Sequence, residues 1–227
     1  LYSPVQKETG YRTLEGGHVL PIEFDSIKDA KEYVDFNKSQ PENVYGNTQF
    51  AYNYISDTYN GVVNWDLDNI LTITIDIEVQ CENGFPDPKL ADEEMLSITI
   101  KNHQSKRIVV FGLHEFTTDR DDVTYIHCES EIHLMKEFMI FWEKHQPDII
   151  TGWNTEFFDI PYLCNRIKKL FGEDEIKRLS PWGSVLEREV YKMGRKHQTY
   201  NIQGVAALDY FDLYRKFTYS AQESYRL

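Results

Sequence analysis

Apolar and polar residues alternate most regularly between residues 71 and 79, which read Leu-Thr-Ile-Thr-Ile-Asp-Ile-Glu-Val. Because successive side chains of a β-strand point to opposite faces, this pattern predicts a strand with isoleucines on one face. Asp76 and Glu78 then lie together on the other face. The β-branched residues around them are typical of a strand inside a sheet.

The positions after residue 79 predict further strands and two longer helices. Strands are expected over residues 95–101, 107–113, 148–151, 185–191, 197–202 and 205–208. A helix over 130–144 carries apolar residues at helical spacing, namely Ile132, Met135, Phe138, Met139 and Trp142. A second helix over 160–171 starts at Asp159 and Pro161, and Gly172 is a natural stop.

The order of these elements predicts a mixed α/β fold. Three strands after residue 71 follow one another as an antiparallel meander, and later strands alternate with helices. A central mixed sheet with helices packed on it is therefore expected, and the ribonuclease H type is the natural candidate. The strands over 185–191 and 197–202 predict a projecting hairpin around Met193-Gly194-Arg195.

Residues 1–70 differ from the rest and predict part of an accessory domain. Glycine and proline recur there, and a helix over 26–37 has Ser26 as its expected N-cap. Strands are expected over 47–55 and 62–66. We see no catalytic signature in this region, so the chemistry is expected in a second domain covering 71–227.

Composition limits the function without defining it. The 227 residues are 41% hydrophobic, which suffices for a core, and no apolar run reaches the roughly 18 residues of a membrane helix. No basic and apolar leader begins the chain, so a soluble, cytoplasmic protein without membrane contact is expected. Cys81, Cys128 and Cys164 are too far apart for a zinc or redox motif and are expected to be packing residues in a reducing compartment.

The formal net charge of −13 argues against a protein that coats nucleic acid, although it permits an enzyme that binds a short stretch of one strand. This charge is unevenly distributed. Residues 166–198 contain nine basic and five acidic side chains, which gives this segment +4 and the remainder −17. Two interpretations are open: a solvated helix and hairpin surface, or a patch that faces phosphates.

The acidic pair in the 71–79 strand is the strongest chemical lead. Two carboxylates on one face repel each other and lose hydration, so such a pair shares a proton, attracts cations or binds divalent metal. Asp159 is a third candidate, because the end of a strand and the start of a helix direct side chains toward a shared cleft. Taken alone, the position of Asp159 favours its interpretation as a helix cap over that as a metal ligand, and one residue can serve both purposes.

Two segments resemble the first and second exonuclease motifs of family B DNA polymerases, in particular those of large tailed bacteriophages. The first is Asp76-Ile-Glu78 followed by Gly84-Phe-Pro-Asp-Pro88, and the second runs from Thr151 to Tyr162 as Thr-Gly-Trp-Asn-Thr-Glu-Phe-Phe-Asp-Ile-Pro-Tyr. They occur in the family's order. Four further segments also resemble this group: Tyr54–Asn60, Asn165–Lys168, Lys177–Pro181 and Leu208–Phe217.

The resemblance implies a metal-dependent 3′–5′ exonuclease that removes misincorporated nucleotides from a primer end. Two divalent ions, Mg²⁺ or Mn²⁺, are then held by carboxylates. By resemblance, Asp76 bridges both ions, Glu78 binds the water-activating ion and Asp159 binds the other. Phe85 matches a position that packs against terminal bases, and Asn154 matches one near the last nucleotide. Their plainer interpretations are a turn aromatic and a strand-end cap.

The hairpin over 185–202 corresponds, by the same resemblance, to one that parts the primer from its template. Its residues Lys192, Arg195, Lys196 and His197 then contact phosphates, or form a solvated hairpin tip. The implied partners are the 3′ end of single-stranded DNA, primer–template DNA and the remainder of the polymerase, with a phage sliding clamp as a further candidate. The implied location is the cytoplasm of an infected bacterial host.

The family's third motif, a tyrosine followed four residues later by an aspartate, is expected after Phe217 but falls beyond Leu227, and no polymerase palm signature occurs. A site short of one ligand predicts little nuclease activity from these residues alone. Asp209 and Asp212 match a segment before that motif and are expected to be caps and surface pairs. The alternatives are a non-cutting DNA-binding or docking module, and a stand-alone or split-gene exonuclease subunit.

Overall fold

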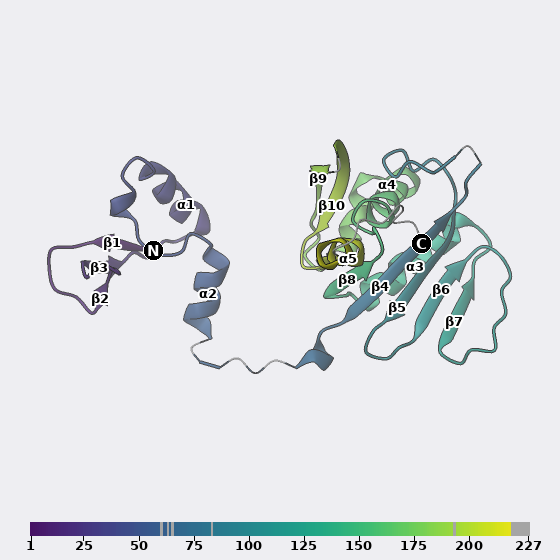
Figure 1. Ribbon diagram of the computed structural model, residues 1–227, viewed down its shortest axis with the longest axis horizontal. Coiled ribbons are helices and arrows are strands. Elements are labelled where there is room, and N and C mark those ends of the chain that lie inside the picture. Colours follow the sequence, from purple (N-terminus) through teal and green to yellow (C-terminus); the bar gives the residue numbers. More distant parts are fainter. Residues whose placement is uncertain (60, 63, 65, 83, 193, 219–227) are drawn as a thin grey trace. The chain divides into compact units, whose positions relative to one another are not determined.

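The computed structural model describes residues 1–218 apart from residues 60, 63, 65, 83 and 193, and it divides the chain into two compact units. The first is Leu1–Trp65 and the second is Asp66–Leu227 (Figure 1). Each unit is described by itself below. Among the described residues, no helix combines the length and the apolar content needed to cross a bilayer.

The first unit contains a small antiparallel sheet and two helices. Its strands are β1 (Tyr2–Pro4), β2 (Tyr11–Arg12) and β3 (His18–Pro21), in the order β1-β3-β2, and its helical segments are α1 (Ile27–Phe36), the 3-10 turn η1 (Pro41–Asn43) and α2 (Phe50–Thr58). Ser26 caps α1 as predicted, because its hydroxyl accepts the N–H of Asp29 at 3.2 Å. The small sheet was not predicted from the sequence.

The strand expected over residues 47–55 is wrong, since this segment forms α2. A strand there needs a neighbour to bind its backbone groups, whereas a helix binds its own. Asn47 supports the helical start, because its side chain accepts the N–H of Gln49 at 2.8 Å. The strand expected over 62–66 includes residues 63 and 65, which lie outside the described residues, and positions 62, 64 and 66 are not in a strand.

The second unit is built on a six-stranded mixed sheet. Its strands are β4 (Thr72–Val79), β5 (Met95–Asn102), β6 (Ile108–Gly112), β7 (Val123–His127), β8 (Ile149–Gly152) and β11 (Ala206–Asp209), in the order β11-β8-β4-β5-β6-β7. Strands β4, β5 and β6 form the predicted antiparallel meander. Strand β8 runs parallel to β4, and β11 runs parallel to β8. The predicted mixed α/β fold with a mixed sheet is confirmed.

Strand β7 was not predicted. It pairs in parallel with β6 at the sheet edge, from Ile108 opposite Val123 to Gly112 opposite His127. Its side chains are only partly buried and show no alternation of the kind that identifies β4. An edge strand of this kind leaves a weak sequence pattern, because neither face is consistently apolar.

Two helices, α3 (Glu131–Lys144) and α4 (Asp159–Phe171), cover the apolar face of the sheet. The unit also has three shorter helical segments: η2 (Leu67–Asn69), η3 (Glu173–Leu179) and α5 (Tyr210–Phe217). Side chains from α3 and α4 pack with the isoleucines of β4 in one core cluster. Ser130 caps α3, and Gly172, with φ of +111°, ends α4 as predicted. The buried stripe of α3 includes Leu134, whereas Ile132, which was expected there, is 39% exposed.

The predicted hairpin is present as a separate two-stranded sheet. Strand β9 (Val185–Lys192) pairs with β10 (Arg195–Ile202), and the register runs from Lys192 opposite Arg195 to Val185 opposite Ile202. Met193 lies outside the described residues, and Gly194 has φ of +76°, which suits a two-residue hairpin turn. The hairpin packs against α4 through β10 (Figure 1).

The three cysteines are free, and their expected packing role holds for two of them. Cys128 and Cys164 are fully buried in the core cluster. Cys81 is exposed, and its thiol donates to the carbonyl oxygen of Gly84 at 2.9 Å, so the packing prediction is wrong for this residue. It lies in the loop after β4.

Candidate functional site

Strand β4 presents its two acidic side chains as predicted. Ile75 and Ile77 are buried, whereas Asp76 and Glu78 are exposed on the other face. The register between β4 and β5 shifts after Glu78, which marks a bulge at the end of the strand. Bulges change the direction of a side chain relative to the sheet, so Glu78 lies where the regular strand geometry ends.

The parallel pairing between β4 and β8 stops early and leaves room beside Ile77. The pairs run from Thr72 opposite Ile149 only as far as Thr74 opposite Thr151. Beyond this point the N–H of Ile77 has no strand partner on that side, and the carboxylate of Asp159 accepts it at 3.0 Å. Asp159 is 4% exposed. The carboxylate of Asp159 is therefore hydrogen-bonded to the backbone of β4 at Ile77, the residue between Asp76 and Glu78.

The expectation that Asp159 caps its helix is wrong. The N-cap position of α4 is Phe158, and no side chain caps it. The first turn of α4 does not need a carboxylate, because Ile160 donates to the carbonyl of Thr155 at 3.0 Å and Tyr162 donates to that of Phe158 at 2.9 Å. Pro161 has no N–H to satisfy. The side chain of Asp159 is consequently available to the sheet.

Ionisation of Asp159 and Asp76 is unfavourable in this fold. Burial, followed by the negative charge of Asp76, raises the pKa of Asp159 from 3.8 to about 7, although the N–H of Ile77 opposes this shift. Asp76 as a whole residue is exposed, but the neighbouring protein partly desolvates its carboxyl group and raises its pKa as well. A cation between these groups would relieve both effects, since it supplies the positive charge that the site lacks.

The three predicted ligands are only partly brought together. Asp76 and Asp159 interact electrostatically, and Glu78 follows on the same face of β4. Within the part of the chain that the structure describes, no three His, Cys, Asp or Glu side chains lie close enough to one another to hold a metal ion. The available donors are carboxylate oxygens, which suit hard ions such as Mg²⁺ and Mn²⁺.

The segment between β8 and α4 approaches β4 closely. A Cβ atom at Gly152 would lie 2.8 Å from the carbonyl oxygen of Ile75 and would collide with the side chain of Thr155. Only glycine fits this approach. Asn154 follows in the left-handed region, with φ of +62°, and its carbonyl accepts the N–H groups of Phe157 and Phe158 at 3.2 and 3.0 Å. This turn leads the chain into α4.

Asp209 is a further residue of this site region. It caps α5 by accepting the N–H of Phe211 at 2.9 Å, which confirms the cap prediction. It also accepts the N–H groups of Asn154 and Glu156, a function that the sequence analysis missed. The pattern of a helix cap could not reveal it, because these partners lie more than fifty residues earlier in the chain. Asp212 forms an ion pair with Lys192 at 2.5 Å, as expected for a surface pair.

Phe85 lies beside the start of α4. Its side chain is 78% exposed, and its ring centroid is 5.0 Å from that of Phe158, the residue before Asp159. The structure therefore brings Phe85 and the second motif together. Its predicted contact with a nucleic acid base stays a prediction, as does that of Asn154.

The hairpin residues differ in their surroundings. Both carboxylate oxygens of Asp212 bind the ammonium of Lys192, which also lies 4.5 Å from the ring centroid of Phe157. The ring of His197 packs against Phe157 at 5.0 Å, and its Nε2 is 3.2 Å from the carbonyl oxygen of Lys192. Lys196 pairs with Glu189 at 3.1 Å. Arg195 is exposed. Of the four residues predicted to bind phosphate, three have partners within the protein.

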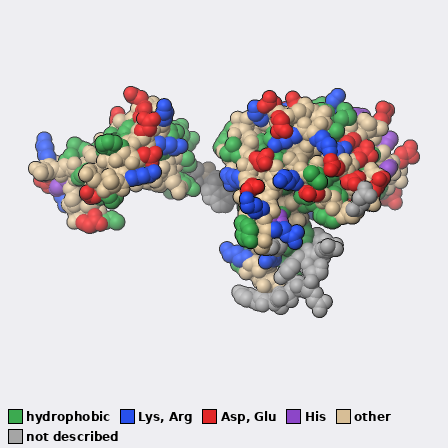
Figure 2. Space-filling view, turned by 90° about the horizontal axis from the view of Figure 1, so that it is seen from above, with side chains coloured by type: hydrophobic (Ala, Val, Ile, Leu, Met, Phe, Trp, Pro, Cys, Tyr) green, Lys and Arg blue, Asp and Glu red, His purple; other side chains and the backbone are tan. Residues whose placement is uncertain are grey.

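Ion pairs account for most of the positive charge between residues 166 and 198. Seven of its nine basic side chains pair with a carboxylate: Arg166, Lys168, Lys169, Lys177, Arg178, Lys192 and Lys196. On the face of the second unit that Figure 2 shows, Lys and Arg side chains lie among Asp and Glu side chains over most of the surface. These observations favour the interpretation of this segment as a solvated, paired surface.

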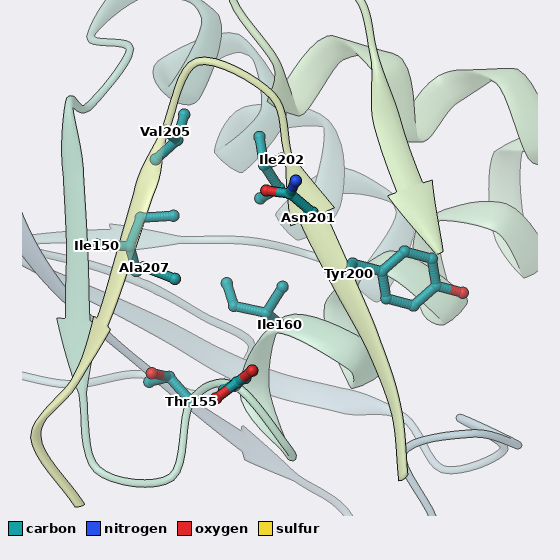
Figure 3. A pocket seen from close by; sticks show the side chains of 9 residues that line it. Ile150, Thr155, Ile160, Tyr200, Asn201, Ile202, Val205 and Ala207 are labelled. Atoms are coloured by element: carbon teal, nitrogen blue, oxygen red, sulfur yellow. The ribbon is translucent and has the colours of Figure 1, made fainter. Parts of the chain in front are cut away.

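A small cavity lies behind the segment that carries Asp159. It is lined mainly by apolar side chains of β8, β10, β11 and α4, and Figure 3 shows Ile150, Ile160, Ile202 and Val205 around it, with Thr155 at one end. Its volume of about 30 Å³ has room for about two water molecules. A nucleotide does not fit there, so this cavity is a packing gap and not a substrate site.

The comparisons with known proteins agree with these motifs. The family model described as DNA polymerase family B, exonuclease domain, matches residues 28–227. The DNA-directed DNA polymerases of Enterobacteria phage T4 and Escherichia phage RB69 are each 31% identical to this chain over its whole length, and the chain spans 28% of the length of each. The DNA polymerase catalytic subunit of Human herpesvirus 7 (strain JI) is 28% identical over 62% of the chain and 15% of that protein.

The family match includes every residue of the carboxylate site, from Asp76 to Asp159, and it continues through the hairpin to the end of the chain. The identity to the two phage polymerases extends over both units. This chain therefore belongs to the family B DNA polymerases, as an exonuclease-domain segment.

Proposed function

We propose that this chain forms the 3′–5′ exonuclease portion of a phage-type replicative polymerase and removes nucleotides from the 3′ end of single-stranded DNA. One observation carries the proposal. Asp159, far from β4 in the sequence, binds the N–H of Ile77 and lies beside Asp76. This is the pair of acidic groups that the two exonuclease motifs would bring to one site.

We also propose that the second unit has a ribonuclease H-like fold. Its strand order supports this assignment, because the meander β4-β5-β6 is followed on the other side of β4 by the parallel strands β8 and β11. In this arrangement the central strand carries the first two acidic residues. The helix after β8 carries the third.

Asp76, Glu78 and Asp159 would hold two divalent ions, Mg²⁺ or Mn²⁺. When bound, such ions activate the attacking water and stabilise the departing 3′ oxygen. The chain's own contribution is the placement of the ligands: the backbone of β4 binds Asp159, and burial keeps the pKa of Asp159 high until a cation arrives. Exclusion of water from Asp159 strengthens the attraction of the site for a cation.

The exposed ring of Phe85 would stack on a terminal base, and Asn154 would lie near the last nucleotide. Stacking suits an enzyme that accepts any base, because every base has an aromatic face. Basic hairpin residues would add phosphate contacts, chiefly through Arg195, since Lys192 is already bound by Asp212. The net charge of −13 argues against coating of long stretches of DNA and permits contact with a short one.

The wider setting is also a proposal. Residues 1–70 would belong to an N-terminal polymerase domain, and residues 71–227 would form the exonuclease domain. The partners would be primer–template DNA, the rest of the polymerase and a sliding clamp, in the cytoplasm of an infected bacterium. The relatives from the two phages support this setting.

A second candidate is a module that binds DNA without cutting it. It is favoured by the finding that no group of three potential ligands is close enough to hold a metal ion among the described residues. In that case Asp76 and Asp159 would still be adjacent, but ion binding would be too weak to support hydrolysis.

The test is degradation of 5′-labelled oligothymidylate by the 227-residue chain with Mn²⁺ or Mg²⁺. We expect slow removal of nucleotides from the 3′ end, and a chelator should stop it. The rate should fall by more than about 100-fold in Asp76→Ala, because loss of a metal ligand lowers activity more than loss of a residue that supports a ligand. The matched control is Asp68→Ala, which changes an exposed aspartate in a similar Asp-x-Asp spacing outside the sheet. DNA binding without any cleavage would support the second candidate. Cleavage that survives in Asp76→Ala would contradict both.

A further inference from the structure

Asp209 lies where β11, α5 and the segment between β8 and α4 meet. Its Oδ1 accepts the N–H of Asn154 at 2.9 Å, and its Oδ2 accepts the N–H of Glu156 at 3.0 Å. Oδ1 also accepts the N–H of Phe211 at 2.9 Å. Asp209 is 8% exposed, so these charge-assisted bonds form largely away from water, where they are strong.

The segment that Asp209 binds needs support from outside. Asn154 has φ of +62°, a left-handed backbone conformation that few non-glycine residues adopt and that surrounding contacts help to maintain. The two amides bound by Asp209 lie on either side of Thr155, which is buried. The carbonyl of Thr155 in turn accepts the N–H of Ile160 at 3.0 Å, in the first turn of α4. A continuous series of hydrogen bonds thus runs from Asp209 to the residue after Asp159.

Two further contacts fix the position of Asp209 itself. In the parallel pairing of β11 with β8, Asp209 lies opposite Gly152, whose close approach to the carbonyl oxygen of Ile75 in β4 leaves no room for a Cβ atom. Trp153 packs against Phe211 of α5, with ring centroids 5.3 Å apart, and against Tyr210 at 5.9 Å. The start of α5 and the segment 153–158 are therefore joined by one carboxylate and one aromatic cluster.

We propose that Asp209 is a positioning residue for Asp159. By binding the amides of Asn154 and Glu156 it fixes the segment 153–158, and this directs the carboxylate of Asp159 to the N–H of Ile77. Backbone N–H groups bind both oxygens of Asp209, so it acts through Asp159 and does not bind ions itself. Its catalytic importance rests on the proposed function, whereas its structural effect can be measured without metal or DNA.

The experiment is native-state amide hydrogen exchange, measured by NMR in the 227-residue chain with a chelator present. Asp209→Ser keeps a good helix N-cap but is too short to reach the segment 153–158. We expect the amide of Phe211 to stay protected, while protection of the Asn154 and Glu156 amides falls about tenfold, as for loss of a charge-assisted bond. The Ile77 amide donates to the carboxylate of Asp159, so its exchange reports whether that carboxylate stays in position. Its protection should fall about three- to tenfold.

Asp209→Asn is the conservative variant, because it keeps the cap and one of the two bonds to the segment. It should give a smaller loss at Ile77, and it is also the informative variant if Asp209→Ser fails to fold. Asp212→Asn is the matched control: it makes the same change on α5, but its bonds run to Lys192, so the Ile77 amide should be unaffected. Unchanged protection of Ile77 in both Asp209 variants would overturn the inference.

A Mn²⁺ titration followed by electron paramagnetic resonance separates this inference from the proposed function. We expect Asp209→Ser to weaken Mn²⁺ binding about tenfold or more, in the range for residues that orient metal ligands, and Asp209→Asn to weaken it less. If the unchanged chain binds no Mn²⁺, the proposed function is contradicted, while loss of protection at Ile77 would still support the positioning by Asp209.

Discussion

Opposing local effects set the pKa of the Asp159 carboxylate. Burial and the negative charges of Asp76 and Asp209 raise this pKa, whereas the backbone N–H groups of Ile77 and Asp159 lower it, and the net value is about 7. The sheet therefore holds the carboxyl group of Asp159 in place, and this group keeps its proton up to about pH 7. Such a group releases its proton readily when a cation approaches, because the cation replaces the proton as the positive partner.

The raised pKa of Asp159 predicts a specific dependence of stability on pH. The native state holds the proton up to about pH 7, whereas the unfolded chain releases it near 3.8, so this group stabilises the fold at low pH and loses that effect as the pH rises to 7. Asp159→Asn keeps the oxygen that accepts from Ile77 and removes the titration. The quantity of interest is the free energy of unfolding of Asp159→Asn minus that of the unchanged chain. We expect this difference to be about 2–3 kcal/mol larger at pH 8 than at pH 5.

Urea unfolding with a chelator present, at both pH values, measures this difference. Other titrating groups largely cancel, because they are common to the two proteins. An equal difference between the two proteins at pH 5 and pH 8 would show that Asp159 is not buried beside a second carboxylate in the metal-free fold.

Single residues were predictable from the sequence where their surroundings are local. Alternation placed Asp76 and Glu78 on one face of a strand, and Ser26 and Gly172 were predicted from nearby helix signals. Taken alone, the same kind of local signal favoured a helix cap for Asp159, and the structure shows no such cap. Its actual partner, Ile77, is 82 residues away, and a contact at that distance leaves no local pattern.

At the scale of elements, a buried ion pair joins α3 and α4. Arg166 on α4 binds both carboxylate oxygens of Glu131 on α3 at 2.6 Å, and each side chain is 9% exposed. Arg166 also donates to the carbonyl of Ala91, and Glu131 accepts the N–H of Met95 at the start of β5. This network joins the helix that carries Asp159 to the loop between β4 and β5 and to the start of β5.

Loss of one partner from this pair should be costly. Arg166→Met leaves a buried carboxylate without its cation, and we expect a loss of about 3–5 kcal/mol in the free energy of unfolding. Adding Glu131→Gln removes that charge while keeping an acceptor for Met95, so the double variant should be more stable than Arg166→Met alone.

Urea unfolding of both variants provides the measurement. Arg178→Met is the control, since Arg178 pairs with Glu143 in a partly exposed position and should lose only about 1 kcal/mol or less. A double variant less stable than Arg166→Met would mean that the unpaired charge is not the source of the loss.

The predictability of elements followed the strength of their periodic patterns. The helices α3 and α4, the meander and the hairpin have clear patterns or turn residues, and all were predicted. Strand β7 and the small sheet of β1, β2 and β3 were not, because these strands are short and, apart from Val19, their side chains are at most partly buried. The sequence did not show which strand pairs with β11. Its parallel partner β8 lies far from it in the chain, and such a pairing leaves no local pattern.

For the whole molecule, the division into two units has consequences for stability. The core cluster lies entirely between Ile73 and Val205, within the second unit. The first unit has only Val19 and Ala30 as fully buried hydrophobic residues among those the structure describes. Because stability grows with buried apolar area, the second unit should be much the more stable.

We therefore expect residues 66–227 to fold without residues 1–65. Three of the four tryptophans, Trp142, Trp153 and Trp182, lie in this unit and report its unfolding by fluorescence. The urea midpoint of the 66–227 chain should match that of the main transition of the 227-residue chain. A chain of residues 66–227 without a cooperative transition would show that its core depends on the first unit.

The central claim is that Asp76 and Asp159 share divalent cations beside the end of a DNA strand. The most direct measurement is anomalous X-ray scattering from crystals of the 227-residue chain grown with Mn²⁺ and a short oligothymidylate. The account predicts an anomalous peak within about 2.5 Å of carboxylate oxygens of both residues, the distance of direct coordination. The peak should disappear in Asp76→Ala. Bound oligonucleotide with no manganese peak at these carboxylates would contradict the account.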